Sequence, residues 1–145
     1  EPLRRAMTAP RPDVATLTVV TEDALIFRFV QPGHIDATAP VNARLQTSAL
    51  QTNEFTPNDH SYGASVYVES ELKGGVDDLF AACEKWKEWR YARVPVDKVN
   101  AIGVTVVLSP QDCEFESIRH AHASLIGVTK PHRSKLLRLI ESHLV

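Results

Sequence analysis

The fold class is indicated by one stretch of the sequence, Asp97-Lys98-Val99-Asn100-Ala101-Ile102-Gly103-Val104-Thr105-Val106-Val107-Leu108. Asp97 is a favourable N-cap for a short helical turn, and Gly103 suits the left-handed residue that ends such a turn. Residues 104–108 then form an apolar and largely β-branched run. This run is typical of an inner strand, because both of its faces are apolar. The stretch therefore contributes one helix and one strand to the expected fold.

Further strands are expected on either side of this stretch. Residues 25–30 are short, β-branched and aromatic, and a polar turn at residues 21–23 separates them from the apolar residues 17–20. Two such runs around a short turn predict a hairpin. Three more segments are expected to be strands: an edge strand at 41–52, a strand at 64–69 and a last strand at 121–127.

Two main helices are predicted, at residues 76–90 and 131–144. In the first, apolar side chains recur at helical spacing, and Trp86 and Trp89 lie three positions apart, as neighbours on a helix surface do. In the second, Pro131 opens the helix and Leu136 to Leu144 supply a buried stripe. The expected order along the chain is strands first, then helix, strand, strand and helix. This order predicts an α+β fold, a two-layer sandwich with a mixed or antiparallel sheet of about five strands.

Length and composition restrict the class of protein. The chain has 145 residues, of which 43% are apolar and 23% charged. This predicts a single α+β domain over residues 14–145, preceded by a flexible N-terminal arm at residues 1–13, which holds three prolines. The net charge of −2 provides no bulk attraction to nucleic acid, and no apolar stretch approaches the roughly 20 residues that span a membrane. Cys83 and Cys113 could form one bridge but no disulfide framework, and Cys83 is expected to be a small buried hydrophobe, so a cytoplasmic location is expected.

The densest polar cluster is His120-Ala121-His122-Ala123-Ser124. In a strand, alternate side chains share a face, so His120, His122 and Ser124 are the candidate catalytic residues. His122-Ala123-Ser124-Leu125 fits half of the motif of two-histidine phosphoesterases, in which each histidine transfers a proton. Such enzymes need a second copy, and the remaining H-x-[ST] sequence, residues 132–134, falls in the final helix. Structural histidines, a pH switch and a metal site are the alternatives. A metal site needs a third and a fourth ligand, for which only His34, His60 or distant carboxylates remain, so no metal is predicted.

A second candidate site lies at the start of the final helix. Lys130, Arg133 and Ser134 gather there, and a helix N-terminus favours anions, which makes the three residues candidates for anion binding. The alternative is a solvated helix face that offsets the acidic loop at residues 112–116. Nucleotide-binding and common hydrolase motifs are absent, so no cofactor is predicted.

Residues 42–127 resemble a loose group of small, uncharacterised bacterial proteins. The resemblance is carried by four short segments: residues 45–50, 64–67, 99–106 and 120–127. The resemblance implies a gene that lies among mobile or conflict-system genes, and with it a partner-binding or accessory role. The resemblance transfers no catalytic residue.

These observations favour a protein–protein interaction module, an accessory or immunity-type component of a bacterial system, over an enzyme. The expected partner is a protein encoded nearby, a homodimer is possible, and neither a membrane nor nucleic acid is expected as a partner. The alternative is a phosphoester-processing enzyme that uses His120, His122 and Ser124.

Overall fold

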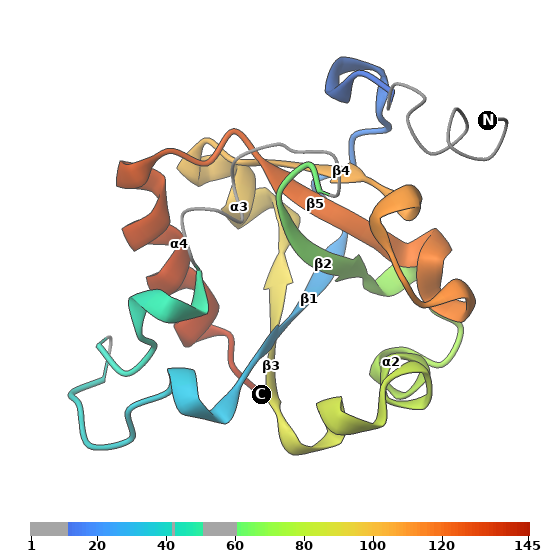
Figure 1. The fold of residues 1–145 in the computed structure, drawn as a ribbon. Coiled ribbons are helices and arrows are strands. Elements are labelled where there is room, and N and C mark those ends of the chain that lie inside the picture. The colour runs from blue at the N-terminus through green and yellow to red at the C-terminus, as the bar shows by residue number, and fades with distance from the viewer. Residues whose placement is uncertain (1–11, 42, 51–60) are drawn as a thin grey trace, which may run out of the picture.

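The computed structural model describes residues 12–41, 43–50 and 61–145, which form an α+β fold around one antiparallel sheet (Figure 1). The expected α+β class with about five strands is therefore confirmed. The strands lie in the order β3-β1-β2-β5-β4, and every pair of neighbours is antiparallel. The strands are β1 Leu25–Val30, β2 Ala64–Val68, β3 Arg90–Pro95, β4 Thr105–Leu108 and β5 His122–Ile126, and the helices are α2 Val76–Ala82, α3 Val96–Ile102 and α4 Lys130–Ser142.

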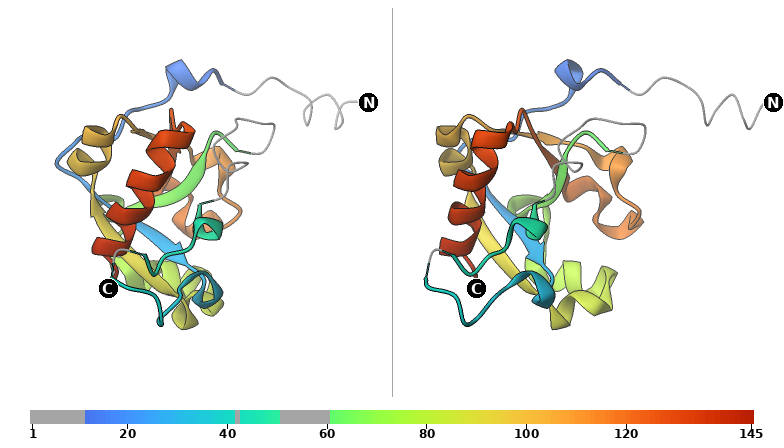
Figure 2. Two further views of the ribbon diagram at one scale, coloured as in Figure 1. Left: turned by 90° about the vertical axis from the view of Figure 1, so that its left-hand side faces the viewer. Right: turned by 60° about the vertical axis from the view of Figure 1, so that its left-hand side comes forward.

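Each face of the sheet carries its own core. On one face, aliphatic side chains of the strands pack against Val96 and Val99 of α3 and against Leu136 and Ile140 of α4. On the other face, a largely aromatic cluster packs under α2 and the 3-10 turns that follow it. Figure 2 shows α4 and α2 on opposite sides of the strands. The aromatic face is the one that carries the candidate site.

The helix predicted at 131–144 is confirmed as α4, whereas the helix predicted at 76–90 is wrong beyond Ala82. Cys83 is extended, Glu84–Glu88 form a 3-10 turn, and β3 begins at Arg90. The spacing of Leu79, Cys83 and Trp86 is helical, but the three buried side chains come from a helix, an extended residue and a turn. A helix as far as residue 90 would overlap the first residue of β3, and Arg90 is instead paired with Val30 at the start of the six-residue pairing of β3 with β1.

The predicted hairpin is also wrong, because residues 18–20 do not pair with β1. Instead the amide of Val20 donates to the Val106 carbonyl at 2.8 Å, and the amide of Leu108 donates to the Thr18 carbonyl at 2.8 Å. The segment thus lies along the outer edge of β4, which is the last strand of the sheet and not an inner one. Residues 18–20 thereby pair backbone groups of β4 that would be unpaired at the edge of the sheet.

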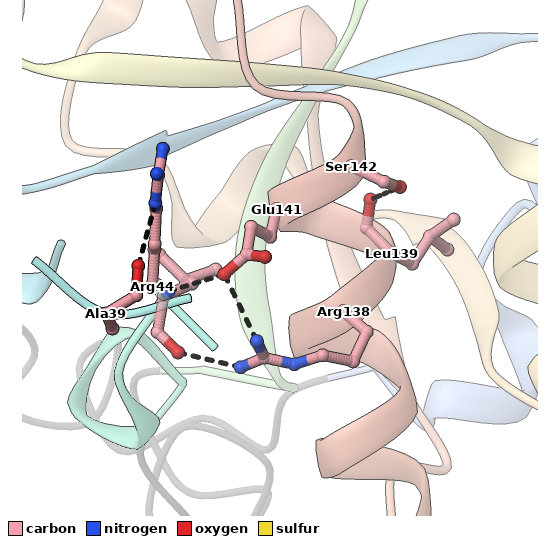
Figure 3. A network of polar contacts seen from close by, with 7 residues as sticks. Ala39, Arg44, Arg138, Leu139, Glu141 and Ser142 are labelled. Atoms are coloured by element: carbon pink, nitrogen blue, oxygen red, sulfur yellow. Dashed lines mark hydrogen bonds and ion pairs between the residues drawn. The ribbon is translucent and has the colours of Figure 1, made fainter. Parts of the chain in front are cut away.

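The edge strand predicted at 41–52 is not formed by its described residues; residues 42, 51 and 52 lie outside the described part. Thr47–Ala49 form a 3-10 turn, and Leu45 makes a single bridge to Ile35. Side chains of α4 bind the backbone here: the carboxylate of Glu141 accepts from the Leu45 amide at 2.6 Å, and Arg138 donates to the Leu45 carbonyl at 2.8 Å. Figure 3 shows Arg138 and Glu141 pointing from α4 toward this segment. The two side chains hydrogen-bond the amide and the carbonyl of Leu45, which a neighbouring strand would otherwise pair.

The helix and strand of residues 97–108 are present nearly as expected. The helix begins at Val96 with Pro95 as its N-cap, two residues earlier than expected, so Asp97 lies in its first turn and is not the N-cap. Gly103 ends the helix at a φ of 105°, in the left-handed region that glycine adopts at no steric cost. In the described part of the chain, no helix has the length and apolar character needed to cross a membrane.

Candidate functional site

A cavity opens where β1 and β2 separate near the centre of the sheet. The two strands pair at Ile26↔Val68 and Phe27↔Tyr67, whereas β1 runs on to Val30 and β2 starts at Ala64. The cavity has a volume of about 700 Å³, which is in the range of small-molecule sites. Its walls include Arg28, Phe29, Ser65, Tyr67, Trp86 and His122.

His122 is the buried polar side chain at this cavity. Its Nδ1 lies 2.9 Å from the main-chain oxygen of Ser109, and its Nε2 lies 3.0 Å from Oγ of Ser65. A carbonyl oxygen can only accept, so Nδ1 carries the proton. In the neutral ring Nε2 is then left with a lone pair, which accepts the hydrogen bond from the Ser65 hydroxyl.

Burial also determines the charge of this imidazole. Desolvation lowers the pKa of His122, because water is withdrawn from the charged form, while the hydrogen bond to the Ser109 carbonyl and the charge of Asp112 act in the opposite direction. Desolvation is the larger effect. The ring is therefore neutral at neutral pH and is able to accept a proton.

Ser65 is the member of this pair that the sequence analysis missed. It lies in β2, where it is the one exposed residue among four buried ones. The strand itself was predicted, and a single polar residue in Ala64-Ser65-Val66-Tyr67-Val68 was a signal that could have marked it. Its proximity to His122 depends on the pairing of β2 with β5, which the sequence does not reveal.

Ser124 lies on the same strand face as His122, as expected, but it has a different partner. Its hydroxyl is 2.7 Å from Oγ of Ser109, and that oxygen is 3.0 Å from Nδ1 of His122. Ser109, which was not predicted, is thus the residue that holds the imidazole. Both serines are fully buried, whereas Ser65 is exposed.

His120 does not share this face, so the expected row of three side chains is wrong at its first member. Glu116–Ala121 form a 3-10 turn, and β5 begins at His122. Side chains of a turn do not alternate between two faces as those of a strand do, so His120 does not share the face of His122 and Ser124. Its ring is exposed, and Nε2 lies 2.7 Å from the Glu71 carbonyl.

The candidate anion-binding residues lie at the start of α4, as expected. Lys130 and Ser134 are exposed. The guanidinium of Arg133, however, donates to the main-chain oxygens of Thr47, at 2.6 Å, and Leu50. Arg133 therefore fastens residues 47–50 to α4, and anion binding at this helix start stays a prediction.

The described residues include neither a metal-ligand cluster nor a disulfide. No group of three or more His, Cys, Asp or Glu side chains is placed to hold a metal ion within residues 12–41, 43–50 and 61–145. Cys83 and Cys113 are free and buried, which confirms the burial expected of Cys83, and both contribute to the cavity wall.

Comparison of the chain with known proteins finds no match: no family model, no curated protein and no solved structure is significantly similar to it. The resemblance to small bacterial proteins, and the accessory or immunity-type role that it implies, therefore stay predictions.

Proposed function

We propose that this protein is a serine-dependent hydrolase that cleaves a small carboxylic ester, with Ser65 as nucleophile and His122 as general base. The observation that carries the proposal is the hydrogen bond of 3.0 Å between Ser65 Oγ and His122 Nε2 at the wall of the cavity. A nucleophile paired with a base, which a third group orients, is the arrangement that activates serine hydroxyls. Here the main-chain oxygen of Ser109 is the third group.

The proposed cycle has two half-reactions, acylation of Ser65 and hydrolysis of the acyl-enzyme. Ser65 Oγ attacks the ester carbonyl carbon while its proton passes to Nε2 of His122. The bond from that carbon to the alcohol oxygen breaks, and Nε2 returns the proton to the departing alcohol. Water then gives a proton to Nε2 and its oxygen bonds to the acyl carbon. The bond from that carbon to Ser65 Oγ breaks, and Nε2 returns the proton to Oγ, which releases the carboxylic acid and restores the Ser65 hydroxyl. The cycle consumes one ester and one water.

Arg28 provides electrostatic support next to the nucleophile. Its Nη1 donates to the main-chain oxygen of Ser65 at 3.0 Å and its Nη2 to the Ala49 carbonyl at 3.0 Å, and its side chain lines the cavity. Negative charge develops on the ester oxygen when Ser65 attacks. The Arg28 guanidinium is held at the main chain of Ser65, and its positive charge would stabilise this negative charge without having to reorganise.

Covalent labelling with a fluorophosphonate probe tests the proposal on the full chain. The probe phosphonylates an activated serine, and mass spectrometry of the digest should place the adduct on Ser65. Ser65→Ala should abolish labelling, and His122→Gln should slow it by about 100-fold or more, the usual contribution of a general base. Ser70→Ala, at an exposed serine outside the cavity wall, is the matched control and should label like the unchanged protein.

A missing or misplaced adduct would overturn the proposal. If the folded protein, checked by circular dichroism, forms no adduct, or forms one at a serine other than Ser65, then Ser65 is not an activated nucleophile. The expected protein-binding role and the expected phosphoester chemistry stay predictions, and neither depends on this result.

A further inference from the structure

The cavity beside Ser65 has a wall built from aromatic rings. Trp86 is at its centre: its ring stacks on Phe29 at a centroid distance of 4.5 Å, and it contacts Phe115 at 5.3 Å and Tyr67 at 5.6 Å. All four of these residues line the cavity. A ring-shaped group in the cavity would therefore meet ring faces and edges.

This aromatic wall reaches the proposed base directly. The ring of Tyr67 lies 5.4 Å from the imidazole of His122, at an interplanar angle of 80°. Tyr67 is also paired with His122 across β2 and β5, two residues from Ser65. If a substrate packs against this wall, its ester bond would thus lie within reach of Ser65.

From these contacts we infer that the ester cleaved at Ser65 carries an aromatic ring. The inference rests on the proposed function and adds the class of substrate to it. Aromatic groups prefer edge-to-face and offset-stacked partners. The four rings of this wall pack on one another in stacked, tilted and edge geometries, and all four line the cavity, so a further ring can join the cluster there. A cavity of about 700 Å³ suits a small ester of this type, in which the ring belongs to either the acid or the alcohol.

Binding can be measured without turnover in the Ser65→Ala variant. The chain has two tryptophans, Trp86 and Trp89, and both line the cavity, so the intrinsic fluorescence reports on its occupation. Titration with methyl phenylacetate, benzyl acetate, methyl hexanoate and hexyl acetate compares rings in either half of the ester with aliphatic chains. We expect at least one aromatic ester to bind about two- to tenfold more tightly than both aliphatic ones, the range that an aromatic pair provides.

A pair of variants assigns the preference to the wall. Phe115→Leu removes a ring that lines the cavity, whereas Phe80→Leu removes a ring of the same cluster that does not line it. In the Ser65→Ala background, Phe115→Leu should bring the aromatic-to-aliphatic affinity ratio close to one, and Phe80→Leu should leave it near its original value.

The two proposals fail in different ways. Aliphatic esters that bind as tightly as aromatic ones, or more tightly, overturn the aromatic substrate class, even when the fluorophosphonate still labels Ser65. Absence of the Ser65 adduct overturns the hydrolase, even when aromatic esters bind. The aromatic-to-aliphatic affinity ratio could also be the same with and without Phe115→Leu in the Ser65→Ala background. That result would show that selectivity arises elsewhere, and would also overturn the role assigned to these rings.

Discussion

Oγ of Ser65 lies 3.0 Å from Nε2 of His122, although the two residues are separated by 57 positions in the chain. The contact is diagonal across two strands, because the register pairs Ser65 with Ser124 and Tyr67 with His122. Diagonal neighbours of an antiparallel pair are within reach of a long side chain. A register slip of one residue would turn Ser65 to the opposite face and break the pair.

The pH dependence of catalysis follows from the burial of His122. Desolvation lowers the pKa of this imidazole from its usual 6.5, with Tyr67 against the ring and Asp112 as the nearby acid. The base must be neutral, so kcat/KM should fall on the acid side with an apparent pKa below 6.5. Burial also raises the pKa of Tyr67, which keeps its phenol neutral over this range. A pH profile of kcat/KM whose acid limb lies above 6.5 would contradict the assignment of His122 as base.

Stability should depend on the same group. A histidine with a lowered pKa in the folded state binds its proton more readily when unfolded, so its contribution to stability is complete above pH 6.5 and is lost as the pH falls. The difference in unfolding free energy between the natural chain and His122→Gln should therefore shrink between pH 7 and pH 5, whatever its size at pH 7. Urea denaturation at several pH values measures it, and a difference that grows toward pH 5 would show the opposite shift.

Ser124→Ala separates the structural serine from the proposed nucleophile. The variant removes a buried hydroxyl that lies 2.7 Å from Ser109 Oγ, which should cost about 1–2 kcal/mol of stability. Nδ1 of His122 retains the Ser109 carbonyl, so fluorophosphonate labelling of Ser65 should slow far less than the roughly 100-fold expected for loss of the base. Labelling lost as completely as in His122→Gln would assign Ser124 a part in the chemistry.

Gly63 precedes β2 and permits its close approach to β5. A Cβ at this position would lie 2.0 Å from the main-chain oxygen of Leu125, which is part of the sheet and cannot move freely. Gly63→Ala should therefore destabilise the fold by about 1–3 kcal/mol or more. Gly33→Ala is the matched control, because a Cβ there meets nothing within 4 Å, and it should change stability by less than about 0.5 kcal/mol. Equal thermal shifts for the two variants would disprove the contact.

Glu141 holds Leu45 in place of a strand partner. Its carboxylate, with a side chain 8% exposed, accepts from the Leu45 amide at 2.6 Å and from Arg138 at 3.1 Å. Glu141→Ala leaves that buried amide without its partner and should cost about 2–3 kcal/mol, and Glu141→Gln, which keeps an acceptor, should cost less. Ser142→Ala, one residue on and exposed, should stay within about 0.5 kcal/mol. Chemical denaturation compares the three, and a neutral Glu141→Ala would rule out the anchoring role.

The sequence predicted those elements whose signals are local. Strands β1, β2, β4 and β5 and helices α3 and α4 are marked by apolar runs, turn residues and caps within a few positions of one another, and each was found. Strand β3 was missed because a helical spacing of apolar residues runs directly into it. Its own signal was present: Ala92 and Val94 are buried, and Arg93 between them is exposed.

The candidate site was half predictable. His122 and Ser124 share a strand face, and a period of two residues is enough to establish that. Ser65 and Ser109 come from β2 and from the end of β4, and no spacing in the chain relates them to β5. Whether His122 is buried, and which of its nitrogens carries the proton, depends on these two neighbours.

The sequence alone determined the α+β class, the approximate number of strands, the final helix and a histidine with a serine on one strand face, because periodicity and capping act over one or two turns of chain. Tertiary structure decided the strand order, the cover at the outer edge of β4 and the separation of β1 from β2. It also decided that a serine 57 positions away faces His122. These features depend on hydrogen bonds and packing between segments distant in sequence, whose partners are fixed when the sheet closes around its two cores.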